Sequence, residues 1–264
     1  MKKFPIIIVI ILLFGGCAKK DTGKIYYTTT DYRVFIKNNR IIEINYLAND
    51  TVRGRTKFYF TDTQVKVVYY GQDTTIQENY ILYKIGENGY AESSIEYPES
   101  IEIVYSDSVY MGRKHYTYNS LDQLITVKYE HHNPVDTSLL TLLSYTYNGE
   151  DIAGSYSQNP YNDCQNQITY ESSDITSKID ILNFTNGILG KTNTKLVKHI
   201  KSASSGFCDP HSSATMEYDM TYTLDDQGYV IQSRKSTKDQ SDSRYPSTGN
   251  TYTTIINYDI RFLD

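Results

Sequence analysis

The chain alternates apolar and polar residues in short runs, and most of these runs come in pairs joined by polar residues. Alternation with a period of two is typical of a half-buried strand. Asn, Asp and Gly tolerate the positive φ angles of tight turns, so each pair predicts a β-hairpin. The hairpin units are VFIKNNRIIEINY from Val34, FYFTDTQVKVVYY from Phe58, LYKIGENGYAES from Leu82, YTYN from Tyr116 and from Tyr145, ITYESSDITSKI from Ile168 and YTLDDQGYVIQSR from Tyr222.

These units predict an all-β fold built as an antiparallel hairpin meander. Their spacing is uneven, mostly 22 to 34 residues, whereas a solenoid would repeat at a fixed period. A sheet of roughly twelve to sixteen strands twists too far to stay open. We therefore expect one domain over residues 25–264, rolled into a barrel, a half-barrel or a sandwich.

Two stretches interrupt the alternation. Residues 173–200 have mixed periodicity, which predicts at most one short helix near 177–187, an irregular passage and a strand near 195–201. The sequence SASSGFCDPHSS at 202–213 has the composition of a loop. Residues 236–250 are polar enough to be a mobile hairpin tip.

The N-terminus has the parts of an export signal. Lys2 and Lys3 precede nine apolar residues, Ile6–Phe14, and small residues follow before Cys17. Nine residues are too few to span a bilayer as a helix. The stretch resembles a bacterial lipoprotein signal, although Phe14 stands where that pattern usually has Leu. The resemblance implies a signal peptide over 1–16, a lipid on Cys17 and a linker over 17–24.

The location that this signal implies is the outer membrane. Ala18 follows the cysteine, so the Asp that retains some lipoproteins in the inner membrane is absent. The side of the membrane on which the protein lies is left open.

Composition narrows the possible partners. Without residues 1–16 the chain has 24 basic and 31 acidic residues, a formal charge of −7, and no basic stretch indicates nucleic acid. The 27 tyrosines supply large amphipathic side chains, which suit sheets that bury one face and solvate the other.

The remaining cysteines, Cys164 and Cys208, predict a disulfide in an oxidising compartment. It would close a loop of about 44 residues, worth ~4 kcal/mol in the chain-entropy treatment. The alternative is a metal site at Cys208 and His211, with Asp163 and Asp209 beside the cysteines. Zinc usually takes four ligands, and only three N/S candidates are present, so the disulfide is the favoured interpretation.

With the hairpins in place, the chain resembles Bacteroidota lipoproteins that carry a β-rich domain of unknown function. The resemblance lies in the Y-x-Y-[ND] hairpins, in SKIDILNF…LGKTNTKLVKHI and in YTLDDQGYVIQSR. The hairpins are also distantly similar to the YD repeats of large secreted shell proteins, without their regular Gly-Arg turn. The resemblance implies a fold and a location, and it implies no activity or cofactor.

No catalytic constellation is evident. Gly190-Lys191-Thr192 is similar to the end of a phosphate-binding loop, but Thr185 occupies the position of the first glycine, so we expect a turn. The sequence contains no Gly-x-Ser-x-Gly and no His-Glu-x-x-His. A membrane-embedded barrel is also disfavoured, because the alternating runs of five to seven residues are short and contain charges such as Glu43, Lys57 and Lys66.

The most specific candidate for binding is the repeated Tyr-x-Tyr, which places two rings on one face of a strand. Tyr116, Tyr118, Tyr145 and Tyr147 form the candidate binding face. We expect a non-enzymatic envelope lipoprotein that binds a glycan, a peptide or a protein. The alternatives are a half-barrel carrier of a hydrophobic ligand and a hydrolase with an unrecognised site.

Overall fold

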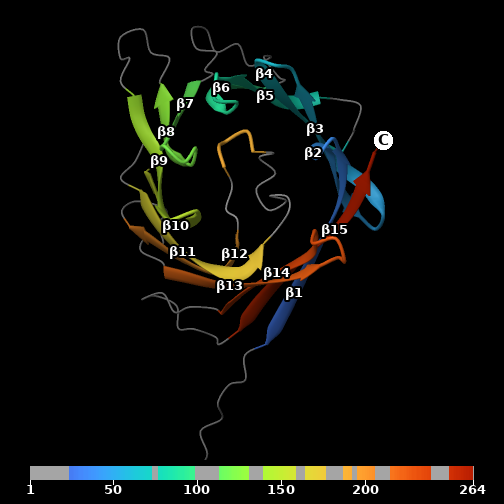
Figure 1. The fold of residues 1–264 in the computed structure, drawn as a ribbon. Helices are drawn as coiled ribbons and strands as arrows, with labels where there is room; N and C mark the ends of the chain where they lie inside the picture. Colours follow the sequence, from blue (N-terminus) through green and yellow to red (C-terminus); the bar gives the residue numbers. More distant parts are fainter. Residues whose placement is uncertain are drawn as a thin grey trace, which may run out of the picture.

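Fifteen strands form one closed β-barrel in the computed structural model of the chain (Figure 1). The structure describes residues 24–72, 77–98, 113–130, 139–158, 164–176, 187–191, 195–205, 215–238 and 250–263. The strands are β1 (Ile25–Lys37), β2 (Arg40–Ala48), β3 (Thr51–Phe60), β4 (Gln64–Tyr70), β5 (Gln77–Ile85), β6 (Ala91–Pro98), β7 (Arg113–Tyr118), β8 (Leu124–Glu130), β9 (Leu139–Asn148), β10 (Asp151–Gln158), β11 (Gln165–Thr176), β12 (Lys195–Ser205), β13 (Thr215–Leu224), β14 (Val230–Lys238) and β15 (Thr251–Phe262). The predicted all-β meander is confirmed, and the closed barrel is the form that it takes.

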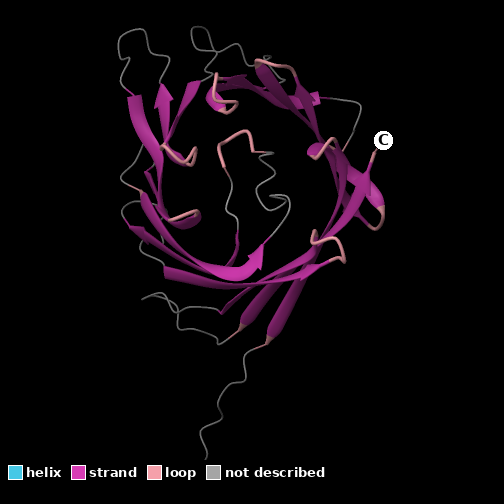
Figure 2. Cartoon of the chain, viewed as in Figure 1, coloured by secondary structure: helices cyan, strands magenta, loops and turns pink. Residues whose placement is uncertain are grey.

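Consecutive strands pair antiparallel, and β1 pairs parallel with β15 from Ile25↔Thr251 to Ile36↔Phe262. The parallel seam follows from the odd number of strands. In a meander the direction reverses at each strand, so the first and fifteenth strands run the same way. Figure 2 shows a ring of strands, turns and loops, with no helix among the described residues.

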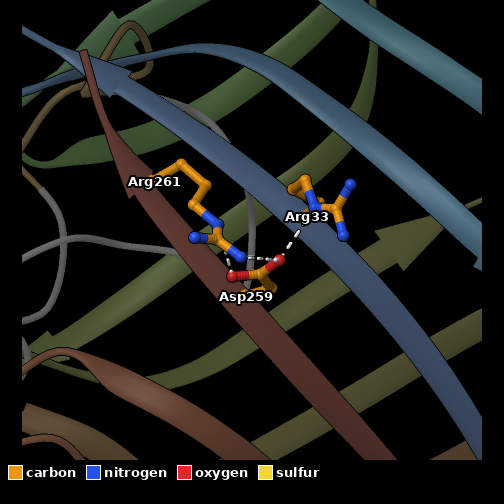
Figure 3. Close-up of polar contacts among 3 residues, drawn as sticks. All are labelled: Arg33, Asp259 and Arg261. Atoms are coloured by element: carbon orange, nitrogen blue, oxygen red, sulfur yellow. Dashed lines mark hydrogen bonds and ion pairs between the residues drawn. The ribbon is translucent and has the colours of Figure 1, made fainter. Parts of the chain in front are cut away.

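Polar side chains cross the seam on one side of the sheet. Asp259 on β15 accepts a hydrogen bond from Arg33 Nε on β1 at 2.8 Å and another from Arg261 Nη2 at 3.1 Å (Figure 3). Asn257 Nδ2 donates to Asp31 Oδ1 at 2.8 Å, and Gln232 Nε2 donates to Asn257 Oδ1 at 2.9 Å. The seam is therefore joined by side chains as well as by its ladder.

The two ends of the barrel differ in how they connect strands. At one end, here called the turn end, most odd-numbered strands turn tightly into the following even-numbered strand. Asn38 and Asn39 both have positive φ, 50° and 58°, as a two-residue hairpin turn requires. The opposite end, here called the loop end, carries most of the longer connections and the start of β1.

Three hairpins at the turn end share one turn geometry, and in the β5–β6 turn Gly86 N donates to Tyr90 O at 2.8 Å. The β7–β8 turn is closed by Asn119 N donating to Gln123 O at 3.0 Å, and Asp122 has a positive φ of 63°. Asn119 Oδ1 also accepts from the backbone N–H groups of Leu121 and Gln123. The β13–β14 turn repeats this, with Asp225 Oδ1 accepting from Gln227 and Tyr229. The Asn or Asp after Tyr-x-Tyr or Tyr-x-Leu thus caps a turn.

The sheet has an apolar inner wall and a polar outer wall. Side chains alternate between the two sides of a strand, and one set forms the buried cluster that packs with Ile188. The turn over residues 187–190 lies inside the ring of strands (Figure 2), so this set is the inner wall. It includes Val34, Ile36, Ile44, Phe58, Val65, Val67, Val230 and Tyr258.

Two elements differ from the prediction. The unit from Ile168 has no hairpin turn in its described part, because β11 continues through its predicted turn as far as Thr176 and pairs with both β10 and β12. Its turn chemistry produces only a local irregularity, in which Ile175 N donates to Ser173 Oγ at 3.1 Å. Residues 202–205, expected in a loop, extend β12. The expected strand near 195–201 is confirmed, while the helix near 177–187 and the tip at 236–250 lie almost wholly outside the described residues.

Candidate binding surfaces

The four tyrosines of the candidate binding face lie on the inner wall rather than on an exposed outer face. Tyr116 packs against the buried cluster, and its hydroxyl lies 2.7 Å from Ser94 Oγ. Burial raises the pKa of Tyr116 and Tyr118, and it raises the pKa of Tyr145 and of Tyr147 to about 12. All four rings are half-buried, so most of their area stabilises the barrel.

Three inward tyrosines tie adjacent strands together at the turn end: the second tyrosine of each Tyr-x-Tyr pair, and Tyr222 of the Tyr-x-Leu stretch. Each hydroxyl donates to a backbone carbonyl near the start of the preceding strand. The bonds are Tyr118 Oη to Ala91 O (2.8 Å), Tyr147 Oη to Leu124 O (2.8 Å) and Tyr222 Oη to Val197 O (2.6 Å). These three residues are named here the lock tyrosines, and Tyr118 and Tyr147 give the repeated Tyr-x-Tyr a structural role.

The segment 187–191 lies across the inside of the barrel at the turn end, and it is named here the plug. Ala91 N donates to Ile188 O at 2.8 Å, and Lys191 N donates to Asp122 O at 2.8 Å. Gly190 forms a bridge with Gln123 and has a φ of +90°. The described turn covers residues 187–189, just before the turn expected at Gly190-Lys191-Thr192, whose last residue lies outside the described part. Lys191 Nζ lies 3.7 Å from Asp122 Oδ2.

Toward the loop end the inner wall becomes polar and aromatic. Lys235 Nζ lies 3.7 Å from the centroid of the Tyr218 ring, and burial lowers the pKa of Lys235. No described carboxylate forms an ion pair with Lys235. Ser155 Oγ lies 3.2 Å from Tyr170 Oη, while Glu96 on the same wall is exposed. Water therefore reaches this part of the inner wall, which combines aromatic rings with both charges.

The outer wall carries charged residues along its strands. Glu43 lies 3.2 Å from Arg55 Nε and 3.8 Å from Lys57 Nζ across β2 and β3. Further cross-strand pairs are His115–Glu130, His199–Asp219 and Lys201–Glu217. The expectation of short strands was wrong, since β2 has 9 residues and β3 has 10. The charges expected to disfavour a membrane-embedded barrel do lie on the outer wall.

One part of the outer wall carries a second group of tyrosines, which the sequence analysis did not single out. Tyr59, Tyr70, Tyr80 and Tyr97 lie on the outer side of β3 to β6, together with Lys57 and Lys66. Tyr59 is 49% exposed. These residues alternate with inward residues such as Phe58, so the register distinguishes them, but the sequence pattern alone could not say which side faces outward.

Most residues of the predicted lipid, disulfide and metal sites lie outside the described part of the chain. Cys17, Cys208, His211, Asp163 and Asp209 are among them, so lipidation, the disulfide and the metal alternative stay predictions. Cys164 itself is described and lies directly before β11. Within the described ranges, no group of three or more His, Cys, Asp or Glu side chains is arranged to hold a metal ion.

The fold is defined by its strand pairing as a closed meander barrel with one parallel seam. No family model matches the sequence, and no curated protein matches it. Among solved structures the chain is similar to a porin-like protein from Bacteroides uniformis, with 16% identity, a TM-score of 0.49 and coverage of 83% of this chain and 85% of that one. It is also similar to a porin-like protein from Bacteroides vulgatus, with 13% identity, a TM-score of 0.43 and coverage of 74% and 88%.

No helix in the described residues has both the length and the apolarity to cross a membrane.

Proposed function

We propose that the protein is a non-enzymatic envelope lipoprotein, held at the outer membrane by a lipid on Cys17, that binds a glycan or a peptide on the inner wall of its barrel near the loop end. The sequence supports the anchor through its signal and supports the absence of catalysis through its lack of a catalytic constellation. The binding site differs from the expected exposed face, because Tyr116, Tyr118, Tyr145 and Tyr147 point inward.

The observation that carries the binding proposal is the composition of the inner wall near the loop end. Lys235 is a half-buried cation over the Tyr218 ring, without a described carboxylate partner. Tyr145 and Tyr170 lie on the same wall, and Glu96 adds an exposed carboxylate. Aromatic rings with a few convergent polar groups are typical of sites for polar ligands.

The apolar half of the inner wall does not favour the hydrophobic-carrier alternative. Its residues are buried against the plug, with Val34 and Ile41 at 0% exposure and Ile188 at 6%. An apolar ligand would have to displace this packed core. A polar ligand near the loop end would leave the core intact.

The position of β1 is compatible with a lipid anchor. Ile25 begins β1 at the loop end, seven residues after Ala18 and eight after Cys17. Eight residues of extended chain reach at most ~28 Å. A lipid on Cys17 would thus hold the loop end near the membrane surface.

The binding proposal is tested with residues 17–264 carrying Cys17→Ala, screened against glycan and peptide arrays. A hit is then titrated by calorimetry against Lys235→Gln and against Lys201→Gln, an outer-wall control. We expect Lys235→Gln to weaken binding and Lys201→Gln to leave it unchanged. Equal loss in both variants, or turnover of a hydrolase substrate that requires one carboxylate, would contradict the proposal.

The anchor is tested in cells with a clickable palmitate analogue. The wild-type chain should be labelled and Cys17→Ala should not be. Equal labelling would exclude lipidation at Cys17. Protease treatment of intact cells would then report whether the barrel lies on the cell surface or in the periplasm.

A further inference from the structure

The outer side of β3 to β6 carries a continuous group of tyrosines, cations and aliphatic residues, named here the Tyr–Lys patch. Its members are Lys57, Tyr59, Lys66, Tyr70, Tyr80, Leu82, Ile95 and Tyr97, which surround Val68, a side chain that is only 2% exposed. Strand register brings them together in two neighbouring rows. One row runs Lys57–Val68–Tyr80–Tyr97, and the other runs Tyr59–Lys66–Leu82–Ile95.

The tyrosine rings of the patch have much of their faces covered. Tyr80 and Tyr97 are stacked, with centroids 4.5 Å apart and an interplanar angle of 10°. Lys66 Nζ lies 4.2 Å from the Tyr80 centroid, and Lys57 Nζ lies 5.9 Å from the Tyr70 centroid. Sugar rings bind aromatic faces, so this arrangement does not suit a stacked glycan. It offers ring edges, phenol hydroxyls and ammonium groups.

The patch has an excess of positive charge within an acidic protein of formal charge −5. Lys66 has no described carboxylate partner. Arg113 continues its row on β7 through pairing with Ile95, and there the row reaches the carboxylate of Glu130 on β8. Lys57 shares one carboxylate, Glu43, with Arg55. Elsewhere on the outer wall, cations such as Lys201 have their own acidic partner. The patch therefore fits an anionic partner.

We propose that the Tyr–Lys patch rests against an anionic phospholipid surface. Tyr and Lys or Arg are the residues that favour the headgroup region of a membrane, where the ring lies among headgroups and the cation meets phosphate. β3 is two strands from β1, and adjacent strands lie about 4.8 Å apart. By register Lys57 is level with Phe35, ten residues along β1 from Ile25 (35 − 25). The patch therefore touches the membrane when the barrel lies on its side, an orientation that a tether reaching ~28 Å from Ile25 permits.

The contact need not be strong to matter. A tethered patch samples the surface at an effective concentration of the order of millimolar, so weak contacts are occupied. Each cation near an anionic surface strengthens binding roughly fivefold at low salt, and the effect is screened as salt rises. This inference concerns the outer wall and does not depend on the inner-wall ligand.

The test uses residues 17–264 with Cys17→Ala, so that no lipid contributes, in sedimentation with vesicles. The vesicles contain phosphatidylcholine alone or phosphatidylcholine with phosphatidylglycerol. We expect binding to the anionic vesicles only, reduced by raised salt. Lys57→Gln with Lys66→Gln should lower the partition coefficient roughly 25-fold, whereas Lys201→Gln should have no effect.

Three outcomes would overturn the inference. They are equal binding to both vesicle types, equal loss in the Lys201→Gln control, and binding of soluble polygalacturonate in place of vesicles, which would make the partner an acidic glycan. Because the patch residues are outward, their replacement should preserve the β-sheet circular dichroism spectrum and melting temperature. If the double variant does not fold, Lys66→Gln alone, expected to lose about fivefold, decides the question.

Discussion

Replacing the lock tyrosines by phenylalanine is expected to destabilise the barrel without changing its shape. Tyr→Phe keeps the ring in place and removes only the hydroxyl that donates to the carbonyl of Ala91, Leu124 or Val197. The three bonds measure 2.6 to 2.8 Å and recur at the turn end in three hairpins. The perturbation therefore isolates one hydrogen bond at each site.

The expected cost follows from the net value of a protein hydrogen bond. Each bond contributes about 1 kcal/mol, within a range of about 0.5 to 1.5 kcal/mol. The three sites share no partner, so their losses should add. The triple variant Tyr118→Phe/Tyr147→Phe/Tyr222→Phe should lose about 3 kcal/mol, a large fraction of the 5 to 15 kcal/mol that is typical of folded domains.

The measurement is equilibrium unfolding in urea of residues 17–264 carrying Cys17→Ala, followed by circular dichroism. The midpoint should fall while the m-value stays constant, because the exposed area on unfolding is unchanged. Tyr46→Phe is the control, since Tyr46 is 41% exposed and its hydroxyl has no partner among the described residues. Its effect should stay within about 0.5 kcal/mol. A triple variant as stable as this control would refute the role assigned to the lock tyrosines.

Three further predictions follow from the barrel. Gly190→Ala should lower the melting temperature, because its Cβ would meet a backbone oxygen at 2.6 Å and its φ is +90°; an unchanged melting temperature would contradict the placement of the plug. Burial raises the pKa of Tyr145 and Tyr147 to about 12, so their contribution to stability is complete below pH ~10 and is lost as the pH rises toward 12; the difference between the absorbance titrations of the wild-type chain and Tyr145→Phe/Tyr147→Phe should appear together with alkaline unfolding, and a difference near pH 10 in the folded state would oppose the prediction. A non-reduced digest should join the peptides of Cys164 and Cys208, and free thiols with stoichiometric zinc would favour the metal alternative instead.

Register across β11 and β12 supports that disulfide. Gln165 pairs with Ser205, so Cys164 lies one residue before this pair on β11. Cys208 follows three residues after Ser205 in the sequence. Strand pairing thus places Cys164 close to the end of β12, and Cys208 is three residues further along the chain. Cys208 itself lies outside the described residues.

The sequence predicted the hairpins because their determinants are local. Asn38-Asn39 adopts the positive φ angles of its turn, and the side chains of Asn119 and Asp225 hydrogen-bond to the backbone of theirs. The failure at 173–174 has the opposite cause. There Ser and Asp favour a turn, but pairing with two neighbouring strands keeps the chain extended.

The side of the wall could not be predicted in the same way. Alternation with a period of two places Tyr116 and Tyr118 on the same face of β7, and Tyr80 and Leu82 on the same face of β5. It does not determine whether that face points into the barrel or outward. That choice depends on closure between β1 and β15 and on the plug, both of which are contacts distant in sequence. The tyrosines that the sequence pattern suggested as an exposed binding face therefore point inward. The tyrosines that do point outward, on β3 to β6, have no distinguishing sequence pattern.

The outer wall predicts that the lipid, and not the strands, holds this protein at a membrane. Arg33, Glu43, Lys57 and Asp259 lie within strands on that wall. A Lys or Arg facing the middle of a bilayer costs about 2 to 4 kcal/mol in a membrane barrel, so a few such residues would consume the 5 to 15 kcal/mol of a typical fold. Residues 17–264 with Cys17→Ala should therefore be recovered from the aqueous fraction without detergent and elute as a discrete species in gel filtration. If the chain without the cysteine enters the detergent phase and keeps its β-sheet spectrum, the outer wall itself enters lipid. That result would contradict the prediction that the outer wall stays in water.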